Sequence, residues 1–169
     1  MQPLIKAYDA VIVGLAVLAG AMVAAVFLAI IYDVSLRTAG FQPPFWTSAL
    51  TEYALLYMTM IAAPWLVRVR GHVFVESAIL QLGAPTRRAV EIVVYIICIV
   101  VCLILAYYAA NQGLDVASRG ELDIRSIIAP RWVLFVPLTV GFFLSAIEFL
   151  RFLIGSNSMY SGTRSVDSL

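Results

Sequence analysis

The sequence is poor in charged residues. Asp, Glu, Lys and Arg make up only 12% of its 169 residues, whereas hydrophobic residues make up 63%. A soluble globular domain carries about 25% charged residues, and its core could not enclose this much apolar surface, so part of the surface must face lipid. The 11 basic residues nearly balance the 10 acidic ones and form no basic patch, which argues against nucleic-acid binding.

Histidine and cysteine are also scarce. His72 is the single histidine, and Cys98 and Cys102 are the two cysteines. A lone histidine cannot complete a zinc site, and no serine or cysteine nucleophile is placed to use it as a base. The cysteines lie one helical turn apart inside a long apolar run, where we interpret them as apolar filler. The sequence also lacks a glycine-rich phosphate loop, so we expect no catalytic residue, no cofactor and no metal.

No carboxylate lies at the centre of an apolar run. A charge at the bilayer centre costs about 3 kcal/mol on insertion scales, so a central carboxylate would mark an ion pathway. Glu148 is the deepest, about two turns before the inner end of the last run. Arg151 follows it by one turn and is its candidate partner in an inner ion pair; Arg87, Arg88 or a partner protein are the alternatives.

Four long apolar runs are present, at about residues 9–32, 48–68, 90–112 and 131–154. About 20 apolar residues cross a hydrocarbon layer of ~30 Å, so the sequence predicts an all-α integral membrane protein with four transmembrane helices in one domain. Spanning strands are not expected, because the apolar runs are unbroken rather than alternating. The tail at 156–169 is rich in Ser and is expected to be mobile.

The connectors predict an orientation. With four spans, the N-terminus, the second connector and the tail share one side and hold seven of the Lys and Arg residues, against four on the other side. Cytoplasmic segments carry the excess of positive charge, so both termini are predicted to be cytoplasmic. The connector between the second and third spans is too polar to cross, but its apolar residues can gather on one side, which predicts an interfacial helix.

Small residues recur every four positions in the first run, at Ala16, Gly20 and Ala24. This spacing lets a second helix approach closely. The face is therefore a candidate packing face, either for a partner protein or for the chain's own helices. Both alternatives are open from the sequence.

The order of these features resembles a known family. Arg37 follows the first run and Glu52 opens the second. An Arg-x-x-Gly-His-Val-x-Val-acid motif ends the second run, formed by Arg68, Gly71, His72, Val73, Val75 and Glu76. Over nearly the whole chain this order resembles the small membrane subunit of tripartite ATP-independent periplasmic (TRAP) transporters. This chain departs from the family at two positions. The family commonly has Asp where Glu76 stands, and it often has a Trp about one turn before the acid that Glu52 matches, whereas Trp46 lies six residues before Glu52.

The resemblance implies an uptake system of three parts in a bacterial or archaeal inner membrane. A periplasmic binding protein captures an organic acid, and a large membrane subunit holds the substrate and sodium sites and moves as an elevator. The small subunit is then a non-catalytic scaffold that packs against the large one within the lipid. The binding protein and the large subunit set the solute.

The same resemblance gives a role to the mixed charges of the outer connectors. They are candidates for docking the binding protein through complementary charge, with solubility of the connectors as the open alternative. These residues are Asp33, Arg37, Asp115, Arg119, Glu121, Asp123 and Arg125.

Two other functions fit the sequence less well. A free-standing, homo-oligomeric transporter or channel would need polar residues inside the helix bundle, and these are scarce. A membrane-embedded enzyme would need a nucleophile with a base, or a metal cluster.

Overall fold

The computed structural model describes residues 2–42, 44–69, 84–124 and 128–154. Its main elements are the helices α1 (Gln2–Thr38), α2 (Trp46–Arg68), α4 (Ala84–Ser118) and α5 (Phe135–Ile154). Each contains a segment long and apolar enough to cross a membrane. This confirms the prediction of an all-α membrane protein with four transmembrane helices. The predicted interfacial helix and the tail at 156–169 lie outside the described residues.

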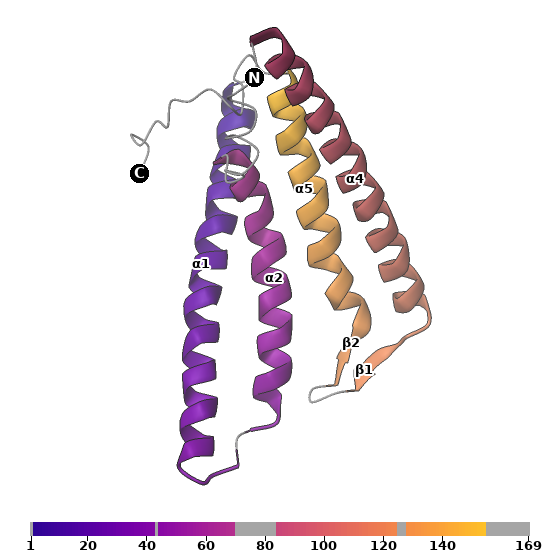
Figure 1. The fold of residues 1–169 in the computed structure, drawn as a ribbon. Coiled ribbons are helices and arrows are strands. Elements are labelled where there is room, and N and C mark those ends of the chain that lie inside the picture. The colour runs from indigo at the N-terminus through magenta and orange to yellow at the C-terminus, as the bar shows by residue number, and fades with distance from the viewer. Residues whose placement is uncertain (1, 43, 70–83, 125–127, 155–169) are drawn as a thin grey trace.

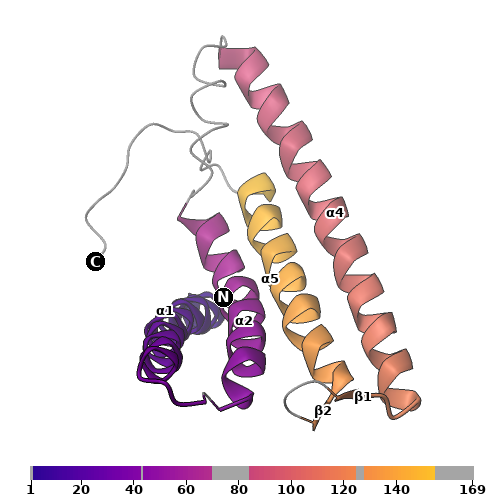
Figure 2. The ribbon, with the colours of Figure 1, turned by 60° about the horizontal axis from the view of Figure 1, so that its bottom comes forward.

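The four helices stand in a row in the order α1, α2, α5, α4 (Figures 1 and 2). Neighbours in the chain form two helical hairpins, and the contact of α2 with α5 joins them. α1 begins and α5 ends at the same end of the row (Figure 1). We call this the inner end, after the predicted orientation, and the end with the α1–α2 turn the outer end.

Glycine ends both α1 and α4, and both helices run further than the predicted spans. Gly40 has a φ of 81° and Gly120 a φ of 64°. The backbone N–H of Gly40 donates to the carbonyl of Arg37, and the N–H of Phe41 donates to that of Leu36. A left-handed residue with these two bonds is a Schellman motif, which caps the last carbonyls of a helix. Gly120 ends α4 in the same way.

These helix ends correct the predicted position of three charged residues. Asp33, Arg37 and Asp115 lie inside helices, whereas the sequence reading placed them in connectors. A helix can continue beyond the lipid boundary into water, where an ion pair between residues i and i+4 stabilises its last turns. The position of the next glycine, rather than of the first charge, therefore sets where the helix ends.

A β-hairpin occupies part of the third connector, whereas the sequence predicts an all-α protein. β1 (Leu122–Ile124) pairs antiparallel with β2 (Ile128–Pro130), and a short 3₁₀ helix, η1 (Arg131–Leu134), leads on into α5. The N–H of Arg131 donates to the carbonyl of Glu121 at 3.1 Å and extends the pairing. The absence of alternating apolar runs excludes spanning strands, but it does not exclude a short hairpin between spans.

α5 lies very close to both of its neighbours. A Cβ on Gly141 would lie 2.5 Å from the carbonyl oxygen of Met60 on α2, and a Cβ on Gly113 of α4 would lie 2.9 Å from the Cβ of Phe135. Only glycine permits such approaches. These two contacts fix the spacing of the three helices.

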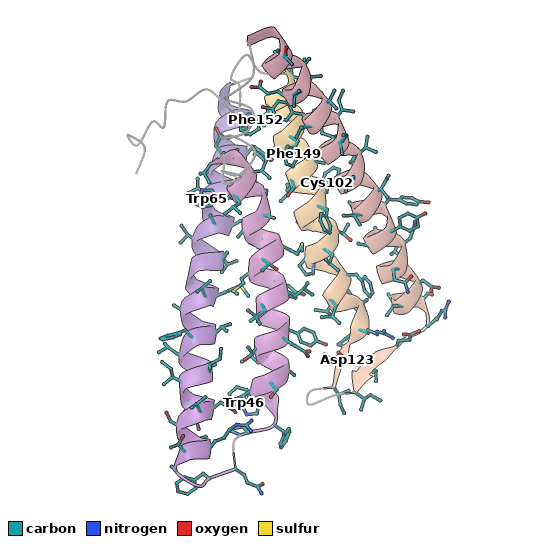
Figure 3. The ribbon with its side chains drawn as sticks, in the orientation of Figure 1. Trp46, Trp65, Cys102, Asp123, Phe149 and Phe152 are labelled. Carbon is teal, nitrogen blue, oxygen red and sulfur yellow. The ribbon has the colours of Figure 1, made fainter. Side chains whose placement is uncertain are left out.

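The buried core lies in the inner half, where α2, α4 and α5 meet. Val67, Tyr95 and Phe149 are its buried members. Cys98 and Cys102 pack against them and are half-buried. Figure 3 labels Cys102 on α4 and Phe149 on α5 in this region.

Candidate functional site

Four charged side chains from three helices meet at the inner end. Arg68, the last residue of α2, donates from Nη2 to Glu148 Oε1 on α5 at 2.8 Å and to Asp9 Oδ1 on α1 at 2.8 Å. Arg151 donates from Nη1 to the same two oxygens, at 3.0 Å to Asp9 and 3.3 Å to Glu148. Each acid contacts both arginines, so the formal charges cancel. We call these four residues the inner charge cluster.

Glu148 is the buried member of the inner charge cluster. Its side chain is 2% exposed, against 21% for Arg68 and 41% for Asp9 and Arg151. A buried carboxylate is tolerated where it is paired and hydrogen-bonded. The ring of Tyr8 adds cation–π contacts, because the guanidinium carbons of Arg68 and Arg151 lie 5.6 Å and 5.3 Å from its centroid. The cluster is therefore an electrostatic joint between α1, α2 and α5.

A second buried acid lies on α4. The side chain of Glu91 is 2% exposed and lies 3.3 Å from Nη1 of Arg88, one turn earlier. One turn later, Tyr95 is fully buried and its ring centroid lies 6.3 Å from that of Phe152 on α5. The inner half of the α4–α5 contact thus combines a paired acid with aromatic packing.

Two tyrosines of α2 make a second joint towards the outer end. The hydroxyl of Tyr53 donates to Asp123 Oδ2 on β1 at 2.9 Å, and the hydroxyl of Tyr57 donates to the carbonyl of Val133 in η1 at 2.8 Å. Figure 3 labels Asp123 at the hairpin. Since η1 leads directly into α5, the α2–α5 contact is tied at both ends. We call this the outer joint.

The predicted ion pair is part of a larger cluster than the sequence reading described. Arg68 lies nearer to Glu148 than Arg151 does. The sequence reading assigned Arg68 to the family motif and overlooked Asp9 as a partner. Both residues lie at the inner limit of an apolar run, so counting 1.5 Å per residue from that limit would have placed them at one depth.

The other motif residues are not among the described ones. Gly71, His72, Val73, Val75 and Glu76 all lie outside the described residues. Glu52 is exposed on the outer part of α2.

The predicted outer charges do not form one patch. Asp33 and Arg37 pair at 2.7 Å at the outer end of α1, and Asp115 and Arg119 pair at 2.8 Å at the end of α4. These helices stand at opposite edges of the row (Figure 1). Arg37 and Arg119 have the most exposed side chains of the two pairs, at 59% and 63%.

Two of the remaining outer charges, Glu121 and Asp123, make contacts within the chain. Glu121 Oε2 lies 2.9 Å from Nη1 of Arg131. Asp123 is half-buried in the outer joint. Arg125 lies outside the described residues.

The small-residue face of α1 points away from the chain's own helices. Gly20 and Ala24 are exposed and Ala16 is half-buried, and a Cβ on Gly20 would meet nothing within 4 Å. Other positions on α1 provide its buried face. They are Ile12, Ala19 and Val26.

The described residues form a cavity but no candidate metal site. Among them, no group of three His, Cys, Asp or Glu side chains could hold a metal ion. A cavity of about 160 Å³ lies between α1, α2 and α5, with Leu15, Met60 and Leu144 among its lining residues. The ion pairs and hydrogen bonds described above are suited to holding the helices together.

Comparison with known protein families gives a match over most of the chain. A family profile described as "Tripartite ATP-independent periplasmic transporters, DctQ component" matches residues 26–156. No curated protein and no solved structure gives a significant match. The matched region begins within α1 and includes α2, α4 and α5.

Proposed function

The chain belongs to the family of the DctQ component of tripartite ATP-independent periplasmic transporters, and on this premise we propose that it is the non-catalytic scaffold of its transporter. The large membrane subunit carries the organic acid and the sodium ions, and a periplasmic binding protein delivers the acid. The complex lies in the inner membrane, with both termini of this chain in the cytoplasm. Four helices of this chain widen the static frame against which the large subunit moves.

The joints at both ends of the α2–α5 contact are the observation that carries this proposal. The inner charge cluster ties three helices through five hydrogen bonds of 2.8–3.4 Å. The outer joint ties α2 to the hairpin and to η1. Packed interfaces switch between discrete arrangements rather than deform continuously. A helix contact that is fastened at both ends and closely packed at Gly141 therefore favours a frame over a moving part.

The pairing of the deep acids supports the absence of an ion path in this chain. Asp9 and Glu148 contact two arginines each, and Glu91 contacts Arg88. A carboxylate that binds and releases sodium or a proton must exchange partners during transport. These acids are instead held by arginines, which stay charged at any physiological pH. We assign sodium coupling to the large subunit.

Two surfaces are proposed to contact the other components. The exposed small-residue face of α1, defined by Ala16, Gly20 and Ala24, packs against the large subunit. The exposed Arg37 and Arg119 at the outer end attract the binding protein. Both assignments are supported by exposure, since Gly20 and Ala24 are exposed and the side chains of Arg37 and Arg119 stay 59% and 63% exposed although each pairs with an acid one turn earlier.

A cross-linking experiment tests the static role. Tyr53→Cys and Asp123→Cys, combined in a chain whose Cys98 and Cys102 are replaced by alanine, can be joined by a short bifunctional thiol reagent. The link replaces the hydrogen bond of the outer joint with a covalent one. In proteoliposomes with the large subunit, the binding protein and a sodium gradient, we expect the uptake rate to be the same with and without the link.

The controls separate a frame from a transport path. Each single cysteine variant receives the same reagent, and a cleavable version of the reagent restores the unlinked chain. Loss of uptake that returns on cleavage would show that these helices move during transport and would reject the static role. Solute flux through vesicles that contain this chain alone would favour a free-standing transporter instead.

A further inference from the structure

The β1–β2 hairpin presents an apolar face that no described part of the chain covers. In the antiparallel register Leu122 pairs with Pro130 and Ile124 pairs with Ile128, so these four side chains share one side of the strands. Ile124 is 74% exposed, Ile128 72% and Leu122 53%, and Pro130 is exposed as well. The other side, which includes Asp123, is half-buried. We call the exposed side the hairpin apolar face.

The length of α5 limits how far the hairpin lies from the inner end. Phe135 precedes Glu148 by 13 residues, which is about 20 Å along the helix. The four residues of η1 add about 8 Å. Pro130 therefore lies at most about 28 Å from the level of Glu148. If the inner charge cluster marks the inner limit of a hydrocarbon layer of ~30 Å, the base of the hairpin lies at the outer limit.

The length of α2 gives a second, independent depth. Tyr53 precedes Arg68 by 15 residues, or about 22 Å, and its hydroxyl holds Asp123 at 2.9 Å. The carboxylate of Asp123, in the middle of β1, is thus held at the level of the outer turns of α2. The hairpin lies across the outer end of α4 and α5 and stops short of the α1–α2 turn (Figure 1). Trp132, which follows the hairpin, is 43% exposed, and tryptophan is enriched at the membrane–water interface.

We propose that the hairpin apolar face is embedded in the outer lipid leaflet, at the boundary between headgroups and acyl chains. There it fixes the depth of the outer end of α4 and α5. This proposal goes beyond the scaffold role and does not depend on it. Its support comes from this chain alone. That support is the two depths, the strand register and the exposure of four apolar side chains.

The size and chemistry of the face favour lipid over a protein partner. Four apolar side chains on two strands of three residues are few beside the roughly 20–30 residues that each partner contributes to a stable protein interface of ~800 Å² per side. A soluble binding protein that docks and leaves would meet a surface about as polar as the rest of the protein. The hairpin apolar face carries no polar side chain among its four described residues.

Spin labels can test this assignment in the full-length chain. Nitroxides are attached to Ile124→Cys and Ile128→Cys in a chain whose two native cysteines are replaced by alanine. Thr38→Cys, exposed at the far outer end of α1, is the control for water, and Val100→Cys, 49% exposed in the middle of α4, is the control for lipid. Collision with oxygen reports lipid, and collision with a nickel chelate reports water. Measurements are made in liposomes, with the chain alone and assembled with the large subunit and the binding protein.

We expect labels at 124 and 128 to collide severalfold more with oxygen than with the nickel chelate, relative to position 38, in both preparations. Nickel collisions as frequent as at position 38 would place the face in water and overturn the proposal. Loss of both collisions on assembly would show that a protein covers the face, and this too would overturn it. Circular dichroism of each labelled chain, together with unchanged behaviour at position 100, verifies that the fold is intact. A static or moving scaffold gives the same result here, so failure of this proposal is distinct from failure of the scaffold role.

Discussion

Glu148 and Arg68 lie 80 residues apart in the chain, yet Oε1 of the first accepts a hydrogen bond of 2.8 Å from Nη2 of the second. Arg68 is both the last residue of α2 and the first residue of the family motif. The motif therefore begins in a joint that holds α2 to α5. Arg68 therefore has a structural role that does not depend on the function of the motif residues that follow it.

The first prediction concerns this joint. Glu148→Gln removes the buried negative charge and leaves Asp9 as the acidic partner of Arg68 and Arg151 among the described residues. Breaking a buried ion pair by removing one member typically costs 3–5 kcal/mol, so we expect the free energy of unfolding to fall by about 3 kcal/mol. Thermal unfolding in detergent, followed by tryptophan fluorescence, measures the change.

Glu121→Gln is the matched control for that experiment. Glu121 also pairs with an arginine, Arg131, but the two side chains are 33% and 54% exposed. An exposed pair contributes at most about 1 kcal/mol. Equal losses for the two variants would contradict the role assigned to the inner charge cluster.

The second prediction concerns the closest approach of α2 and α5. Gly141→Ala places a Cβ 2.5 Å from the carbonyl oxygen of Met60, so the two helices must separate. Overpacking of this kind costs about 1–3 kcal/mol. Gly20→Ala is the control, because its Cβ meets nothing within 4 Å, and we expect no loss of stability. The same unfolding assay compares them, and an unchanged Gly141→Ala protein would show that the contact is looser than described.

The third prediction concerns the proposed contact with the large subunit. Ala24→Leu enlarges a residue of the small-residue face, whereas Ala25→Leu makes the same change about 100° around the helix. Both positions are exposed in the chain itself, so neither variant should lose stability. We expect only Ala24→Leu to reduce recovery of the large subunit in co-purification. If both variants recover it equally, this face does not form the interface.

The fourth prediction concerns the outer joint. Tyr53→Phe removes the hydroxyl that donates to Asp123 and keeps the ring. Hydrogen bonds to charged groups contribute about 1.5–3 kcal/mol, so the hairpin should open more often. Hydrogen exchange at the backbone amides of β1 and β2 should accelerate, while that of α1 stays unchanged. Tyr107→Phe, at a side chain that is 65% exposed, is the control and should leave the hairpin as protected as before.

The fifth prediction concerns docking of the binding protein. Arg37→Glu and Arg119→Glu reverse exposed charges at opposite edges of the row. Changing a peripheral charge mainly alters the association rate and its dependence on salt. We expect at least one of the two variants to slow association at low salt, with the difference vanishing as salt screens the charges. Surface plasmon resonance on the reconstituted membrane complex measures this, and unchanged rates in both variants would leave solubility as the role of these charges.

The sequence alone was sufficient to predict a membrane protein with four helices. An unbroken apolar run of 20 or more residues has few stable alternatives to a spanning helix, because every backbone polar group in lipid must be bonded within the segment. The order of runs, Arg68 and the residues that follow it also identified the family. The ends of α1 and α4 could have been read from Gly40 and Gly120, and taking the first charge as the end was the error.

The partners within the fold needed the tertiary structure. Asp9 and Arg68 are 59 residues apart, and nothing near either residue in the chain indicates the other. The same holds for the close approach of Gly141 to Met60 and for the hydrogen bond of Tyr53 to Asp123. The physical reason is that lipid and helix interiors are equally apolar, so the hydrophobic pattern of a spanning helix does not say which face meets another helix. Composition and run length decided that this chain crosses the membrane four times, and only the rotation and depth of each packed helix decided which residues hold it together.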